Sequence, residues 1–147
     1  MPELPEVETI RKSIEPFLAN AIVTAVDVRE SRLRCPVNSA DFSRWIVGKR
    51  IVSVARRAKY LILQLENDAS VIIHLGMSGR LGIFAADAAI ETHTHVIFHL
   101  DSSIQVRYRD PRRFGLVEVT PPQAFATWFR FTNLGVEPLS AAFNHHY

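Results

Sequence analysis

The stretch IVSVARRAKYLILQLENDASVIIHL, residues 51–75, decides the fold class of this chain. Its β-branched and aromatic residues fall into three short runs at residues 51–57, 60–65 and 71–75. Asn67-Asp68, between the last two runs, is typical of a hairpin turn, and a hairpin makes neighbouring strands antiparallel. The stretch therefore predicts short antiparallel strands.

Comparable runs continue along the chain at residues 22–28, 95–100, 104–109 and 116–119. Together the runs give seven or eight short strands, which is typical of an antiparallel β-sandwich or barrel. We expect a β-sandwich of about eight strands. Residues 85–89 are small and featureless, as in a surface loop.

A long helix is predicted ahead of the first strand. Apolar residues recur there at helical spacing and form one stripe: Val7, Ile10, Ile14, Phe17 and Leu18. Pro16 is expected to kink or end this helix. The fold class is therefore mainly β with α, a β-sandwich preceded by a long N-terminal helix.

One or two short helices are also expected. Ser39 is suited to cap a helix that ends near Gly48, and Pro121-Pro122 can open another. Aromatic residues follow helical spacing in both: Phe42 and Trp45 in the first, Phe125, Trp128 and Phe129 in the second. We interpret these aromatics as packing residues rather than as a platform for stacking bases.

Length and composition favour one globular domain. The chain has 147 residues, of which 48% are hydrophobic, enough for a single core. No apolar run approaches the ~20 residues that span a bilayer, and the acidic start is unlike the basic start of a signal peptide. We therefore expect a cytoplasmic protein without a membrane partner.

The sequence gives little support for disulfide or metal chemistry. The single Cys35 cannot form an intramolecular disulfide, and no zinc-ligand cluster surrounds it. We interpret Cys35 as a small, semi-buried hydrophobe. His93 and His95 alternate along one strand face, but two candidate ligands are too few for a metal site.

Basic residues are grouped in three clusters, although the net charge is only +2. The clusters are Arg29, Arg32 and Arg34; Arg50, Arg56, Arg57 and Lys59; and Arg107, Arg109, Arg112 and Arg113. They could converge on one surface that follows a phosphate backbone, or they could be solvated strand ends. The sequence alone leaves both interpretations open.

The first residues have the layout of an N-terminal nucleophile. If an aminopeptidase removes Met1, the secondary amine of Pro2 becomes the N-terminus, with the carboxylates of Glu3 and Glu6 close by. A free α-amine has a pKa of about 7.7–8.0, so an appreciable fraction is nucleophilic near neutral pH. The alternative is an ordinary helix start, since a first turn tolerates proline. If Met1 stays, the Pro2 nitrogen lies in a peptide bond and is no nucleophile.

Two further motifs lie at predicted strand ends. In residues 56–60, RRAKY, alternation would place Arg57 and Lys59 on the same side, where they could contact phosphate. In residues 74–79, HLGMSG, Met77 stands between two glycines, an unusual position for a core residue.

The stretch Asp110-Pro111-Arg112-Arg113-Phe114-Gly115 predicts a stiff turn that presents two cations and an aromatic ring. Proteins that expel a base from a duplex need apolar side chains for the vacated space and a cation for the orphaned partner base. The turn is therefore a candidate wedge for duplex DNA.

Five stretches together resemble the formamidopyrimidine-DNA glycosylase family, the bifunctional repair enzymes that excise oxidised purines. They are PELPEVET, RRAKYL, HLGMSG, RYRDPRRFG and NLGVEPL, and they follow the family order through nearly the whole chain. Each stretch is weak alone, whereas the ordered set is specific. The PELPEVE start resembles the formamidopyrimidine branch rather than the endonuclease VIII branch, which typically starts PEGPEI.

The resemblance implies catalytic roles for four residues. Pro2 is similar to the residue that attacks C1′ of the damaged nucleotide to form a Schiff base, after which β- and δ-elimination cut the strand on both sides. Glu3 resembles the acid/base that moves protons to the sugar and base. Glu6 resembles its active-site companion, and Lys59 the lysine near the damaged base and phosphate.

The resemblance also implies DNA-binding residues. His74 is similar to a backbone-phosphate contact, and Arg113 to a phosphate or structural contact. Three others match the residues that fill the helix after base flipping: Met77, Arg112 and Phe114. The implied partner is double-stranded DNA with an oxidised purine or an abasic site, and we expect the protein to bind it as a monomer.

The resemblance covers the N-terminal half of the family. It implies a catalytic β-sandwich domain over residues 1–135 and the start of a linker over residues 136–147. Family members continue into a helix-two-turn-helix domain and usually a four-cysteine zinc finger, whose ligands these residues lack, so no cofactor is expected in this chain. Two alternatives stay open: a fragment that binds DNA weakly without catalysis, and a β-sandwich interaction domain with no nucleic-acid role.

Overall fold

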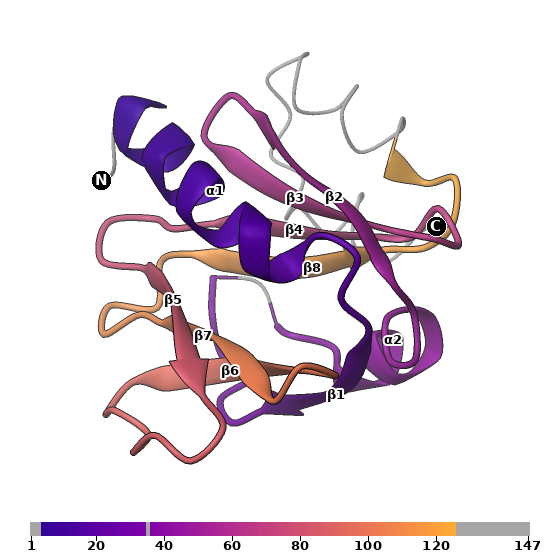
Figure 1. The fold of residues 1–147 in the computed structure, drawn as a ribbon. Helices are drawn as coiled ribbons and strands as arrows, with labels where there is room; N and C mark the ends of the chain where they lie inside the picture. Colours follow the sequence, from indigo (N-terminus) through magenta and orange to yellow (C-terminus); the bar gives the residue numbers. More distant parts are fainter. Residues whose placement is uncertain (1–3, 35, 126–147) are drawn as a thin grey trace.

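Two antiparallel sheets of four strands each form the centre of the fold (Figure 1). The computed structural model describes residues 4–34 and 36–125. The first sheet has the order β2 (Ile51–Arg57), β3 (Tyr60–Leu65), β4 (Ser70–His74) and β8 (Leu116–Thr120). The second has the order β1 (Val23–Val28), β6 (Thr94–Leu100), β7 (Ile104–Arg109) and β5 (Arg80–Ala85). The predicted antiparallel sandwich is confirmed.

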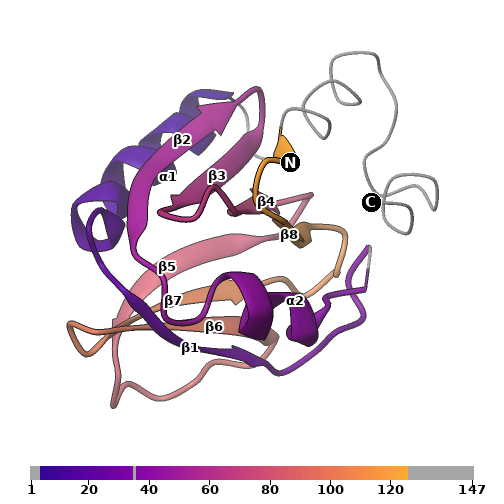
Figure 2. The ribbon, with the colours of Figure 1, turned by 90° about the vertical axis from the view of Figure 1, so that its right-hand side faces the viewer.

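The hydrophobic core lies between the two sheets, which form separate layers in Figure 2. Alternate residues of each strand point inward, because successive side chains of a strand face opposite sides. Inward-facing residues of β3, β4, β6 and β7 belong to one core cluster: Leu63, Val71, Phe98, Val106 and Tyr108. The burial of this apolar surface holds the two layers together.

Helix α1 (Leu4–Leu18) packs against β2, β3 and β5. Val7, Ile14 and Leu18 are buried in the core, as the stripe predicts. Phe17, however, is 46% exposed, so its assignment to the stripe is wrong. At about 100° per residue it lies roughly 80° from Val7, at the edge of the buried face. Pro16 lies inside the helix, which ends two residues later.

Helix α2 (Ser39–Trp45) forms where it is predicted, but its cap is Asn38 and not Ser39. The Asn38 Oδ1 accepts hydrogen bonds from the amides of Ala40 and Asp41, at 3.0 and 3.2 Å. These amides have no partner inside the helix, so the Asn38 side chain satisfies them. The ring of Phe42 packs edge-on against Phe98 with centroids 5.7 Å apart.

Several predictions fall outside the described residues. Among them are Cys35, the boundary between residues 135 and 136, and most of the helix expected after Pro121-Pro122, with its Trp128 and Phe129. Phe125 is described, and it packs on the outer side of the first sheet. Within residues 4–34 and 36–125, no helix is long and apolar enough to cross a membrane.

The strand β5 does not appear among the predicted runs. Its sequence, RLGIFA, is interrupted by Gly82, and it forms an edge of the second sheet beside β7. A glycine weakens the strand signal because it contributes no side chain to the alternation. Of the loop predicted for residues 85–89, Ala85 is still the last residue of β5, and the residues after it lead to β6.

Candidate functional site

Four segments that are far apart in the sequence lie at one end of the sandwich, on the left in Figure 1. They are the start of α1, the β2–β3 turn, the β4–β5 loop and the β7–β8 loop. The last two carry most of the predicted DNA-binding residues, and we call them the wedge loops: residues 75–79 and 110–115.

The buried carboxylate of Asp110 joins the two wedge loops. It accepts hydrogen bonds from the hydroxyls of Ser78 and Tyr108, at 2.6 and 2.7 Å, and from the backbone amides of Arg113 and Gly115, at 3.1 and 2.8 Å. Burial alone would raise the pKa of Asp110, but these hydrogen bonds outweigh it and hold the pKa below its ordinary value. Asp110 is therefore an ionised acceptor that fixes the turn.

The backbones of the wedge loops touch directly. Gly76 has φ +60°, and a Cβ atom there would lie 2.7 Å from the carbonyl carbon of Phe114. Only glycine tolerates both this conformation and this approach. A side chain on Gly115 would meet the carbonyl oxygen of His74 at 2.6 Å. The two loops therefore behave as one rigid unit.

This unit presents three of the predicted residues to solvent. Met77 is 51% exposed and Phe114 47% exposed. The guanidinium of Arg112 lies 5.3 Å from the centroid of the Phe114 ring, and the Arg112 amide donates to the Ser78 hydroxyl at 3.1 Å. The structure thus brings together an apolar side chain, a ring and a cation, the groups that a wedge requires.

His74 ends β4 at the base of the wedge loops and is buried. Burial, followed by the charges of Arg34 and Lys59, lowers the pKa of His74 to about 4. Its Nδ1 accepts a hydrogen bond from the Gly76 amide at 3.0 Å, so the ring proton of the neutral form resides on Nε2. His74 can therefore donate one hydrogen bond, which suits a phosphate oxygen.

Lys59 lies near His74, but strand alternation is not the reason. Arg57 pairs with Tyr60 across β2 and β3, so Ala58 and Lys59 form a two-residue turn, and strand alternation does not extend to Lys59. Ala58 has φ +52°, as tight turns require. Tyr60, which follows Lys59, is paired with His74 in the sheet, with ring centroids 4.9 Å apart. This pairing brings Lys59 to the His74 end of the sheet.

Glu6 is exposed in the first turn of α1, whereas Pro2 and Glu3 lie outside the described residues.

The sequence does not predict the ion-pair bridge that connects α1 to β2. The Glu8 carboxylate accepts from Arg11 and from Arg56 Nε at 3.0 Å, and these hydrogen bonds lower the pKa of Glu8 to about 2. Arg11 also donates to the Val54 carbonyl at 3.2 Å. The bridge helps to fix where α1 begins.

The three basic clusters meet only in part: Arg34 and Lys59 both act on His74, whereas Arg50 lies apart from them. Arg50 precedes β2 and therefore lies at the opposite end of that strand from Arg57. Its side chain donates a hydrogen bond to the Asn20 carbonyl. Glu30 pairs with Arg32 at 2.9 Å and with Arg113 at 3.5 Å. The side chain of Arg113, one of the predicted phosphate contacts, is therefore held in a surface ion pair.

In residues 4–34 and 36–125, no group of three or more His, Cys, Asp or Glu side chains could hold a metal ion. His95 is committed to the wedge loops, because its Nε2 is hydrogen bonded to the Asp110 carbonyl at 2.6 Å. The chain has one cysteine, so its residues do not fit a four-cysteine zinc site.

Sequence interpretation missed the groups that hold the wedge. They are Ser78, His95, Tyr108 and Asp110, and all four side chains converge on the turn. Asp110 carried a signal, since an aspartate before proline is typical of the first position of a turn. Tyr108 carried none, because its alternation with Val106 marks both residues simply as core.

Comparisons with known proteins agree with this geometry. The family described as "Formamidopyrimidine-DNA glycosylase N-terminal domain" matches residues 1–117. Proteins named formamidopyrimidine-DNA glycosylase from Dichelobacter nodosus and Laribacter hongkongensis are each 44% identical, over 95% and 98% of this chain and 50% and 52% of their own length. The chain thus spans about half the length of the curated relatives it matches.

Solved structures show the same likeness. A complex between Lactococcus lactis Fpg and an abasic site containing DNA has a TM-score of 0.80 and 30% identity, over 88% of this chain and 47% of that chain. A complex of Lactococcus lactis Fpg with a FAPY-dG containing DNA has a TM-score of 0.79 and 29% identity, over 87% and 48%. Sequence, fold and the arrangement of the motifs agree, and the chain belongs to the formamidopyrimidine-DNA glycosylase family.

Proposed function

We propose that this chain is the catalytic N-terminal domain of a DNA glycosylase and AP lyase that removes oxidised purines. The free amine of Pro2 attacks C1′ of the damaged nucleotide and forms a Schiff base, and β- and δ-elimination follow. Glu3 transfers protons to the sugar and base, Glu6 assists, and Lys59 engages the substrate near its phosphate. The partner is double-stranded DNA bound by one copy of the protein. The matched relatives come from bacteria, whose DNA lies in the cytoplasm, so we place the protein there.

The wedge carries this proposal. The wedge loops hold the Met77 and Phe114 side chains about half exposed and away from the core, where an apolar partner can cover both. A base stack supplies that partner, because an inserted side chain replaces the contacts of the expelled base. Arg112, stacked beside Phe114, adds a donor for the base left unpaired.

Borohydride trapping on duplex DNA with an abasic site tests the proposal. Reduction converts the Schiff base into a stable covalent adduct, which intact mass and peptide mapping locate. We expect an adduct at residue 2 in chains from which Met1 has been removed. Chains that retain Met1 are the control, since their Pro2 nitrogen is an amide and should give no adduct. Efficient trapping with Met1 retained would contradict the role of Pro2 and indicate a lysine.

A second candidate is a fragment that binds DNA weakly and does not catalyse. It is favoured by one fact, that the matched relatives are about twice as long as this chain. Fewer phosphate contacts lower both the affinity and the steepness of its salt dependence. No adduct from Met1-free chain, under conditions in which full-length Lactococcus lactis Fpg is trapped, would support this candidate against the first.

A further inference from the structure

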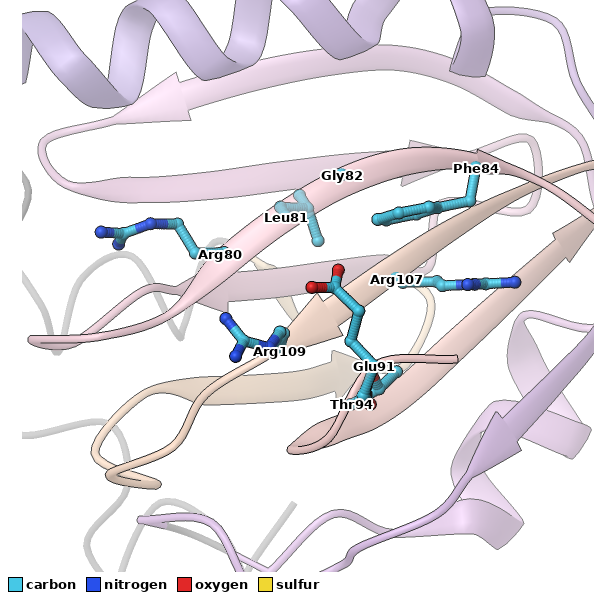
Figure 3. A pocket seen from close by; sticks show the side chains of 8 residues that line it. All are labelled: Arg80, Leu81, Gly82, Phe84, Glu91, Thr94, Arg107 and Arg109. Atoms are coloured by element: carbon cyan, nitrogen blue, oxygen red, sulfur yellow. Dashed lines mark hydrogen bonds between the residues drawn. The ribbon is translucent and has the colours of Figure 1, made fainter. Parts of the chain in front are cut away.

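The outer face of the second sheet contains a pocket that the proposed chemistry does not use (Figure 3). Its volume is about 150 Å³. Polar and aromatic residues of β5, β6, β7 and the loop between β5 and β6 line it: Arg80, Phe84, Glu91, Thr94, Arg107 and Arg109. Along β7, Arg107 and Arg109 alternate with Val106 and Tyr108, which are buried in the core, so the pocket opens on the opposite side.

Arg107 builds one wall of this pocket. It is only 3% exposed, and its Nε and two terminal nitrogens donate to Gln105 Oε1 and to the carbonyls of Ala89 and Ala88, at 2.8 to 2.9 Å. Its guanidinium lies 4.7 Å from the centroid of the Phe84 ring. The Arg107 side chain is therefore fixed, and it holds the β5–β6 loop in place.

Arg80 and Arg109 occupy the other side of the pocket and directly oppose each other across β5 and β7. Like charges in such a pair repel and destabilise the sheet unless a counter-charge lies between them. Arg80 donates to the Gly79 carbonyl at 3.0 Å, and Arg109 Nε donates to the Thr92 carbonyl at 2.9 Å. Within residues 4–34 and 36–125, neither forms a salt bridge. Their other N–H groups remain available for an anion.

Glu91 is the acidic residue in the lining of the pocket. In Figure 3 its exposed side chain extends from the β5–β6 loop, and its carboxylate lies between Arg109 and Arg107. No salt bridge joins it to either arginine of the pair. Its carboxylate is therefore bound to neither guanidinium group, and a phosphate group, with more acceptor oxygens, suits the two guanidinium groups better.

The position of the pair indicates where the phosphate comes from. Arg80 follows Met77 by three residues, and Arg109 precedes Arg112 by three, so the pair borders both wedge loops. Three residues span at most about 10 Å, so a duplex that takes up the wedge passes its backbone close to the pair. We propose that Arg80 and Arg109 bind a backbone phosphate of the DNA beside the wedge; this rests on the proposed function.

The test measures binding of the whole chain to duplex DNA with a stable abasic analogue, by fluorescence anisotropy at several salt concentrations. Arg80→Gln and the double variant with Arg109→Gln should lower affinity, the double variant about tenfold, and reduce the salt slope by about 1. Arg44→Gln is the control, because it removes the same charge from α2, at the far end of the sandwich. It should change neither the affinity nor the salt slope beyond a small uniform effect. Arg80 is exposed, so its single variant keeps the fold.

The acidic residues provide a test of opposite sign. Glu91→Gln should strengthen DNA binding two- to fivefold, because it removes a negative charge that repels the phosphate. A gain of this size corresponds to one weak charge interaction. Asp87→Asn is the matched control: it lies exposed on the same loop, outside the pocket, and changes the net charge equally. Equal effects of the two variants would overturn the inference.

Arginine Nε–Hε signals in NMR spectra separate the possible failures. DNA that shifts the Nε–Hε signals of Arg80 and Arg109 and the methyl signal of Met77 supports both proposals. DNA that shifts Met77 but not the arginines, with unchanged salt slopes, overturns this inference and leaves the proposed function intact. Shifts with inorganic phosphate alone, but not with DNA, overturn the assignment to the DNA backbone. An absence of any DNA binding overturns the proposed function itself.

Discussion

At the scale of single residues, the wedge depends on side chains that would never touch DNA. Asp110 is fully buried and accepts from four donors, so its charge stabilises both loops at once. We expect Asp110→Asn to lower the free energy of unfolding by about 2–4 kcal/mol. The Asn side chain replaces one acceptor oxygen by an NH₂ group, which would face the hydroxyl and N–H donors that now bind the carboxylate. Tyr108→Phe, which removes one of these bonds, should cost about 1 kcal/mol. Urea unfolding checks both, and equal losses would contradict the central role of Asp110.

His74 gives the same loops a dependence on pH. Its pKa of about 4 lies below the ordinary 6.5, so the unfolded chain binds more protons between these values. The contribution of His74 to stability should therefore fall as the pH drops from about 6.5 to about 4, by about 3 kcal/mol, and should not change further below that. His74→Gln keeps an acceptor for the Gly76 amide but cannot titrate. Urea unfolding across this pH range should show the loss in the parent and a flatter profile in the variant; coinciding profiles would exclude this role.

At the scale of elements, α1 shows where packing departs from periodicity. Ile14 is 1% exposed and belongs to the core, whereas Phe17 of the same predicted stripe is 46% exposed. Ile14→Ala should therefore cost roughly 2–5 kcal/mol of unfolding free energy through the cavity it leaves. Phe17→Ala should change it by less than about 0.5 kcal/mol. Chemical denaturation of both variants measures the difference, and comparable losses would mean that Phe17 packs in solution.

The strands show why the sequence predicts some elements and not others. β7 alternates between apolar and polar residues, whereas β3, β4 and β6 are short apolar runs that are buried over most of their length. Both patterns are strong strand signals. β5 lacks these signals, since Gly82 stands in its middle and Phe84 uses the space above that glycine: a Cβ there would meet the ring at 2.9 Å. Such a tertiary contact leaves no periodic trace. The cap of α2 was misplaced by one residue for a similar reason, because Ser39 and Asn38 both suit the position.

At the scale of the whole molecule, the candidate site is assembled from segments that only the fold brings together. Short motifs identified the exposed side chains Met77, Arg112 and Phe114, because glycines and proline mark loops locally. The Asp110 network and the Glu8 bridge involve partners up to 48 residues apart, and no local pattern encodes such distances. The sequence therefore predicts the groups that would meet DNA better than the groups that hold them.

This division between apolar wedge and cationic contacts predicts two distinct kinds of DNA-binding defect. Phe114→Ala should weaken binding to abasic duplex by about 1–3 kcal/mol and leave the salt slope unchanged, because the ring stacks but carries no charge. Lys59→Gln should instead reduce the slope by about 1. Phe17→Ala is the matched control, since Phe17 is as exposed as Phe114 but lies near the C-terminal end of α1. Fluorescence anisotropy at several salt concentrations separates the two effects. A changed slope for Phe114→Ala, or equal loss for Phe17→Ala, would show that binding does not depend on insertion of the wedge.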